Sequence, residues 1–133
     1  SRRVRTPIAT GEIHATHWEF QQIIDLGAAS ILQADAGVCG GVTEWRKIAH
    51  IAELSKLSMA PHWLADVHLH LVAATSNATW VEYFTNHDVL NVGRLFTTGL
   101  DVVPGGLKLP RTPGLGFEFD ERAVGHYSAD GWV

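Results

Sequence analysis

This sequence has a single cysteine, no long apolar run and only a small net charge. Each of these features excludes some classes of protein. The 133 residues include one cysteine, Cys39, so no disulfide can form within the chain. No uninterrupted apolar run approaches the ~20 residues that a membrane-spanning helix needs. The formal net charge of -4 gives no reason to expect nucleic acid or an anionic membrane as a partner. We therefore expect a protein of a reducing compartment, the cytoplasm, that binds neither nucleic acid nor membrane.

The composition is that of a packed globular domain. Hydrophobic residues make up 46% of the chain and charged residues 18%, which is typical of a folded protein and not of a disordered one. The N-terminal stretch SRRVRTPIATGE is basic but has no apolar core of signal-peptide length after it. It leads almost at once into a strand-like segment, and we interpret this abrupt start as that of a chain cut out of a longer one.

Short apolar strands alternate with amphipathic helical segments over the first two thirds of the chain. The sequence predicts strands over 7–12, 30–35, 58–62 and 79–84, and helices over 16–28, 40–57 and 65–76. Thr16 and Glu19 have the spacing of a capping box, and Asp66 is predicted to cap the third helix. This alternation is typical of βαβ units and a parallel sheet.

The remainder, residues 85–133, is predicted to be an irregular tail. Prolines and glycines recur there, notably in PGG at 104–106 and PGLG at 113–116, and they favour turns over regular structure. A short helix is predicted near 120–124.

Each predicted strand carries an ionisable residue at or near its carboxyl end. These residues are Glu12, Asp35, His62 and Glu82. In a parallel βα array the strand ends lie on one face, and in a (β/α)8 barrel that face carries the active site. The spacing therefore predicts that the four side chains form one ring.

Each of these residues also has a purely structural interpretation. Glu12 could be a helix-capping or solvent-facing carboxylate, and Asp35 could be a turn residue. His62 could be a buried histidine with satisfied hydrogen bonds, and Glu82 could pair with an arginine or lysine. Two other histidines, His68 and His70, lie two residues apart on a predicted helix and do not share a face, so we expect both to be packing or surface residues.

The ordered set of motifs resembles the enolase superfamily, in its mandelate racemase/muconate lactonizing enzyme-like branch, which includes acid-sugar dehydratases. The matching stretches are IATGE (8–12), ILQADAGVCGGVTEWRKIAHIAE (31–53), APHW (60–63), VEYF (81–84) and PGLGFEFDE (113–121). The resemblance implies an α/β fold of about four parallel strands alternating with helices, the C-terminal half of a (β/α)7β TIM-type barrel. Residues 1–133 would form one partial barrel domain, with barrel strands five to eight over about 7–84 and the tail over 85–133.

The resemblance also implies a role for each strand-end residue. Glu12 matches a carboxylate ligand of the essential Mg²⁺, and Asp35 and His62 match an Asp–His dyad in which His62 is the general acid/base. Glu82 matches a glutamate that hydrogen-bonds the carboxylate of the substrate. The implied function is that of a fragment of a Mg²⁺-dependent enzyme that abstracts the α-proton of a carboxylate, most simply a sugar-acid dehydratase. The alternatives are a racemase or epimerase of the same superfamily, or a non-catalytic assembly fragment.

The family's other catalytic groups belong to barrel strands that this sequence does not contain. Two further metal carboxylates and a lysine acid/base precede the matching region in such enzymes, as does the capping domain. We therefore expect an incomplete site in the chain as given. The expected partners are a small carboxylate substrate such as a sugar acid, and either a second copy of the chain or the missing half of the barrel.

Overall fold

The structure, a computed structural model, describes residues 4–85 and 92–129. The chain divides into two compact units, Ser1–Tyr83 and Phe84–Val133, and each is described by itself. The candidate site lies in the first unit.

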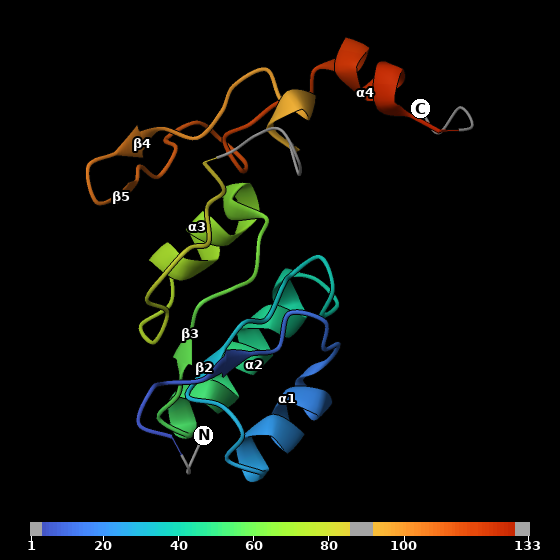
Figure 1. Cartoon of the computed structure of the whole chain (residues 1–133). Coiled ribbons are helices and arrows are strands. Elements are labelled where there is room, and N and C mark those ends of the chain that lie inside the picture. Colours follow the sequence, from blue (N-terminus) through green and yellow to red (C-terminus); the bar gives the residue numbers. More distant parts are fainter. Residues whose placement is uncertain (1–3, 86–91, 130–133) are drawn as a thin grey trace. The chain divides into compact units, whose positions relative to one another are not determined.

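The first unit is an alternation of short strands and helices (Figure 1). In chain order these are β1 (Ala9–Thr10), α1 (His17–Asp25), β2 (Ile31–Leu32), α2 (Val42–Leu54), β3 (Ser58–Met59) and α3 (Ala65–Ala73). The three predicted helices are present, each ending a few residues before its predicted carboxyl end. Each of the first three predicted strands is present as a core of two residues.

The strands form a parallel sheet in the order β1-β2-β3, which confirms the predicted α/β class. Ala9 pairs with Ile31, and Ile31 pairs with Ser58, so the strands advance in step and end at one edge. The fourth predicted strand, 79–84, is reduced to a single parallel bridge between Ala78 and Met59. Two backbone hydrogen bonds link Met59 to this segment. The Met59 amide donates to the carbonyl of Asn77 at 2.8 Å, and the Thr79 amide donates to the carbonyl of Met59 at 3.0 Å.

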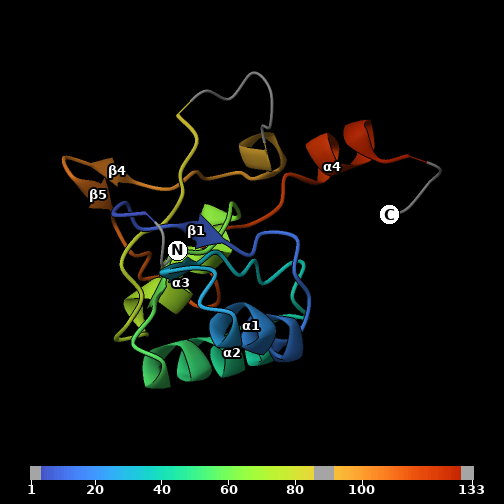
Figure 2. The same ribbon diagram turned by 60° about the horizontal axis from the view of Figure 1, so that its bottom comes forward.

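The core of the first unit lies between the sheet and the first two helices. α1 and α2 pack against each other, and Figure 2 shows them side by side below β1. The largest side chains in this core, Trp45, Phe20 and Leu32, are fully buried. The Trp45 indole donates to the carbonyl of Ala34 at 2.9 Å, which satisfies its polar group in the core. Burying side chains of this size is the main stabilising contribution to the unit.

The helix starts differ from the predicted caps. Thr16 is the N-cap of α1, but its side chain makes no capping hydrogen bond. Glu19 does reach back, although to the amide of Ala15 at 2.8 Å. The N-cap of α3 is Leu64, in a left-handed conformation, and Asp66 is the second residue of the helix. The prediction that Asp66 caps α3 is therefore wrong.

One polar cluster joins the first two helices. Glu44 of α2 contacts the ring nitrogen Nδ1 of His17 in α1 and accepts from Lys47 at 2.9 Å. Hydrogen bonds from His17 and Lys47 lower the pKa of Glu44 to about 2, because they favour its ionised form. His17 is the first residue of α1.

The second unit contains short elements in the predicted tail. They are the 3₁₀ helix η1 (Val92–Leu95), the antiparallel pair β4 (Val102–Val103) and β5 (Gly106–Leu107), and α4 (Glu121–Tyr127). Pro104 and Gly105 make the turn between the two strands, with Gly105 at φ 83°. The predicted helix near 120–124 is present as α4, and its N-cap Asp120 accepts from the amides of Arg122 and Ala123.

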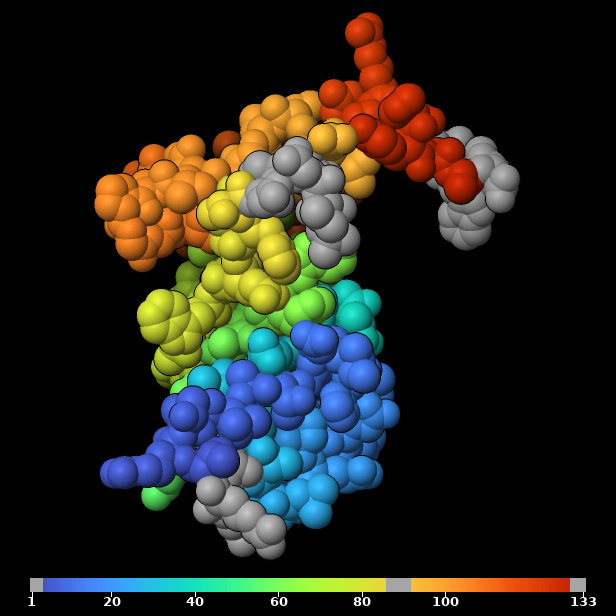
Figure 3. Space-filling view, in the orientation of Figure 1, coloured from blue at the N-terminus to red at the C-terminus, as the bar shows by residue number. Residues whose placement is uncertain are grey.

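Exposed apolar side chains are frequent on the first unit. Ile13 is 80% exposed, Trp18 69% and Leu26 76%, and Figure 3 shows α1 at the surface.

Within 4–85 and 92–129, no helix is long and apolar enough to cross a membrane.

Candidate active site

Three of the four predicted site residues follow the carboxyl ends of three adjacent parallel strands. Glu12 follows β1, Asp35 follows β2 and His62 follows β3. Because the strands are in register, these side chains emerge at the same edge of the sheet. The structure brings the three side chains together.

Asp35 and His62 form the centre of this group. Nδ1 of His62 lies 3.2 Å from Oδ2 of Asp35, at hydrogen-bond distance. The Asp35 side chain is 2% exposed and that of His62 is 29% exposed, so the carboxylate is buried while the ring reaches solvent. A carboxylate accepts hydrogen bonds, so Nδ1 carries the proton and Nε2 is left available for chemistry.

The loop after β2 holds the buried carboxylate in place. The other oxygen of Asp35, Oδ1, accepts from the amide of Gly37 at 2.7 Å. A Cβ at Gly37 would lie 2.8 Å from Leu64 Cδ1 and 3.2 Å from Asp35 Oδ1, so a larger residue there would displace the Leu64 side chain. The glycine thus allows the backbone to approach the carboxylate closely.

Glu12 faces the opposite side of the histidine ring. Its Oε2 lies 3.7 Å from His62 Nε2, and its side chain is 54% exposed. Gly11 places it there, with φ of 127° and with no room for a Cβ, which would lie 2.6 Å from Cε1 of Phe20. The left-handed turn at Gly11 ends β1 and directs the next residue to the strand-end edge.

Glu12 carries the exposed carboxylate of this group. Magnesium prefers an octahedron of oxygen ligands, and the exposed Glu12 carboxylate is suited to supply one of them. Within the described residues, no group of three or more His, Cys, Asp and Glu side chains is arranged to hold a metal ion.

Glu82 hydrogen-bonds Trp63, the residue that follows His62. Its Oε2 accepts from the amide of Trp63 at 2.7 Å. Trp63 and Leu64 have positive φ angles of 50° and 35°, which are strained for residues with side chains. Glu82 thus holds the strained backbone that follows His62.

The sequence did not reveal the role of His68. This residue of α3 is completely buried, and Nε2 lies 3.7 Å from Oδ1 of Asp35. Its ring is hydrogen-bonded to backbone on both sides, to Ala36 and to Trp63. The expectation of a packing or surface residue misses these polar contacts. No short-range sequence signal predicts these contacts, because one of the two partners, Ala36, lies 32 residues away along the chain.

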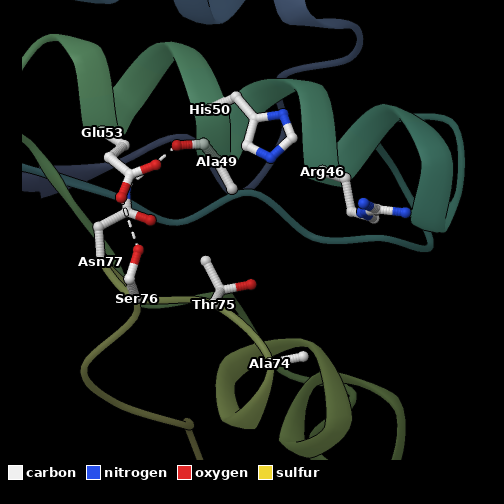
Figure 4. Close-up of a pocket in the computed structure, with 8 residues that line it drawn as sticks. All are labelled: Arg46, Ala49, His50, Glu53, Ala74, Thr75, Ser76 and Asn77. Atoms are coloured by element: carbon white, nitrogen blue, oxygen red, sulfur yellow. Dashed lines mark hydrogen bonds between the residues drawn. The ribbon is translucent and has the colours of Figure 1, made fainter.

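A separate small pocket lies between α2 and the segment after α3 (Figure 4). Its volume is about 110 Å³, and its walls are mainly polar. Glu53 there accepts from Ser76 Oγ at 2.6 Å, and Asn77 Nδ2 donates to Ala49 O at 3.1 Å. None of the four predicted site residues lines it, so we attribute no catalytic role to this pocket.

A parallel β/α frame with an Asp–His pair and a carboxylate at its strand ends is typical of the active face of a barrel enzyme. Residues 1–123 match the family described as enolase C-terminal domain-like. The chain belongs to this family, as the motifs had indicated.

Curated relatives of the chain include sugar-acid dehydratases. The chain is 37% identical over 118 residues to an L-talarate/galactarate dehydratase of Salmonella typhimurium, with 89% of this chain and 28% of that protein covered. It is 30% identical to an arabinonate dehydratase of Saccharolobus solfataricus, with 96% of this chain and 35% of that protein covered. The chain thus spans about a third of the length of these relatives.

Solved structures agree with this assignment. An L-talarate dehydratase from Polaromonas, complexed with Mg and L-glucarate, superimposes with a TM-score of 0.82 at 34% identity, covering 93% of this chain and 33% of that one. A Bradyrhizobium enolase complexed with magnesium and mandelic acid has a TM-score of 0.83 at 28% identity, covering 96% of this chain and 34% of that one. Both of these structures hold magnesium and a small carboxylate.

Proposed function

We propose that this chain supplies the Asp–His acid/base pair, one magnesium ligand and one substrate-binding glutamate of a sugar-acid dehydratase. The observation that carries the proposal is the 3.2 Å contact between His62 and Asp35 at adjacent strand ends. It occurs in a chain whose curated relatives are dehydratases of talarate, galactarate, arabinonate and rhamnonate.

In this proposal His62 acts on the leaving hydroxyl. Dehydration moves the proton on the carbon next to the carboxylate to Nε2 of His62, which is unprotonated in the neutral ring, and the electron pair left on that carbon expels the hydroxyl of the following carbon. The C–O bond breaks with its electron pair going to oxygen, and His62 gives that oxygen a proton from Nε2, so that water departs. Asp35 keeps the proton of Nδ1 in place and stabilises the imidazolium before the transfer.

Glu12 and Glu82 act on the substrate carboxylate. Removing the α-proton places negative charge on the two carboxylate oxygens, and a divalent cation bound by Glu12 and by ligands outside this chain would stabilise that charge. A protonated Glu82 could donate a hydrogen bond to the same oxygens. Its contact with the Trp63 amide uses one oxygen, Oε2, which leaves Oε1 for the substrate.

The test uses the full-length protein that contains these residues and a panel of acid sugars. Talarate, galactarate, arabinonate and rhamnonate are incubated with Mg²⁺ or with EDTA, and the keto acid produced by dehydration is measured. We expect keto acid from at least one sugar acid with Mg²⁺ and none after chelation. No keto acid from any of them in the presence of Mg²⁺ would refute the dehydratase assignment.

The likeness to the Bradyrhizobium protein complexed with mandelic acid supports racemisation as a second candidate. Both reactions begin with removal of the α-proton, so the same incubations are repeated in D₂O. Deuterium incorporation at the α-carbon without keto acid indicates a racemase or epimerase. Neither product nor exchange indicates a non-catalytic assembly role.

A further inference from the structure

The buried ring of His68 bridges the backbone beside both members of the Asp–His pair. The Ala36 amide, directly after Asp35, donates to Nε2 at 2.9 Å. The Trp63 carbonyl, directly after His62, lies 2.7 Å from Nδ1. One imidazole therefore joins the two loops that carry Asp35 and His62.

These two partners fix the protonation of the ring. A carbonyl only accepts, so Nδ1 must carry a proton, while a backbone amide only donates, so Nε2 must be unprotonated. Burial lowers the pKa of His68, which also favours the neutral ring. His68 is thus a neutral donor and acceptor of fixed orientation.

His68 hydrogen-bonds backbone that has an unfavourable conformation. Trp63 and Leu64 have positive φ angles, and such backbone persists only where its surroundings hold it. Glu82 holds the Trp63 amide at 2.7 Å, and His68 holds the carbonyl of the same residue. The peptide groups after His62 are therefore fixed from two sides.

We infer that His68 is a positioning residue that sets the distance between Asp35 and His62 by joining Ala36 to Trp63. This inference rests on the proposed acid/base role of the pair. His68 itself need not touch substrate, because both of its ring nitrogens are already occupied by backbone groups.

Three substitutions in the full-length protein separate the two hydrogen bonds. Asparagine places its amide near the position of Nδ1, so His68→Asn keeps the bond to Trp63. Glutamine reaches the position of Nε2, so His68→Gln keeps the bond to Ala36. His68→Leu removes both bonds, and His50→Gln changes an exposed histidine of α2 as the matched control.

We measure kcat and KM for the preferred acid sugar, corrected for the folded fraction, together with a crystal structure of each variant. We expect His68→Leu to lower kcat about 100-fold, the loss typical of a misplaced catalytic group, with KM little changed. His68→Asn and His68→Gln should be intermediate, and His50→Gln should match the wild type. A folded His68→Leu protein with wild-type kcat would overturn the inference.

Two further outcomes are also decisive. If His68→Leu does not fold, the inference is tested with His68→Asn and His68→Gln. A wild-type kcat in both of these variants overturns the inference. If the wild type dehydrates no sugar acid, the proposed function is refuted but the inference about His68 is not. The crystal structures then test the bridge, and an Asp35–His62 contact unchanged from 3.2 Å in both amide variants overturns it.

Discussion

At the scale of single residues, His62 is the one side chain of the group that combines a reactive nitrogen with access to solvent. We predict that His62→Asn lowers turnover about 100-fold or more, the contribution typical of a general acid. Asparagine keeps the approximate shape, so the melting temperature should stay near that of the wild type. Asp35→Asn should show a smaller loss.

Steady-state kinetics with a sugar acid from the panel proposed above test this prediction, with His50→Asn as the surface-histidine control. Retained turnover in His62→Asn would show that His62 is a structural residue and not the general acid.

The Cys39 thiol should be unreactive while the protein is folded. It is completely buried, and burial, together with the nearby charges of Asp35 and Glu44, raises its pKa from 9.0 to about 11. A two-unit rise lowers the thiolate fraction about 100-fold, and the thiolate is the reactive form. We expect negligible alkylation by iodoacetamide at pH 8 and one alkylated site after denaturation. Mass spectrometry measures both, and rapid labelling of the native protein would contradict the prediction.

Burial of His68 makes stability depend on pH in a definite direction. Its pKa in the folded chain is below the ordinary value of 6.5. Above pH 6.5 the ring is neutral in both states, so His68 contributes its full stability there. Below pH 6.5 the unfolded chain binds a proton that the folded chain does not, and stability falls until the pH reaches the folded pKa.

We therefore expect the free energy of unfolding of the wild type to fall more steeply than that of His68→Gln as the pH decreases from 7 to 5. The slope from one such proton is at most about 1.4 kcal/mol per pH unit. Urea denaturation at several pH values measures the difference. Parallel curves for the two proteins would show that His68 is not held neutral.

At the scale of elements, Asn77 ties the loop after α3 to α2 and to the segment that follows α2. Its Nδ2 donates to the carbonyls of Ala49 and Leu57, both at 3.1 Å. Asn77→Ala should destabilise the protein by about 2 kcal/mol, because two part-buried carbonyls lose their side-chain donor. The neighbouring Ser76→Ala, which removes an exposed hydrogen bond to Glu53, should cost well under 1 kcal/mol.

Denaturation of the two variants in parallel measures the difference. Equal losses would show that the Asn77 amide does not hold these elements together.

At the scale of the whole molecule, β1 is an edge of the sheet. The carbonyls of Ile8 and Thr10 accept from Ile31 and Gln33 of the β2 segment, so the alternating peptide groups of Ala9 point away from β2. An edge strand of this kind pairs readily with another chain. We therefore predict that the chain as given associates in solution through this edge.

Sedimentation velocity over a range of concentrations tests this association. Ala9→Pro is the matched variant, because it removes the outward amide and leaves the bonds to β2 in place. We expect the wild type to exceed the 14.5 kDa of one chain, and Ala9→Pro to associate more weakly. A wild type that remains monomeric, or an Ala9→Pro protein that associates equally, would contradict the prediction.

Local patterns were sufficient to predict the α/β class, the three helices of the first unit and α4. Helix periodicity is a short-range signal that acts within a few residues. The strand-end positions of Glu12, Asp35 and His62 could also be predicted, because parallel strands in register bring their carboxyl ends together. The catalytic roles of these residues stay proposals drawn from family resemblance.

Contacts between distant segments decided the remaining features. The predicted strand 79–84 became a bridge at Ala78, since a strand is stabilised only by the neighbours that pair with it. Asp66 did not cap α3, because the helix begins at Ala65 and Leu64 takes the N-cap position. His68 had the sequence of a packing residue, and its two polar partners lie 32 and 5 residues away. Hydrogen bonds of that range depend on the packing of α3 against the strand ends, which no local sequence pattern encodes.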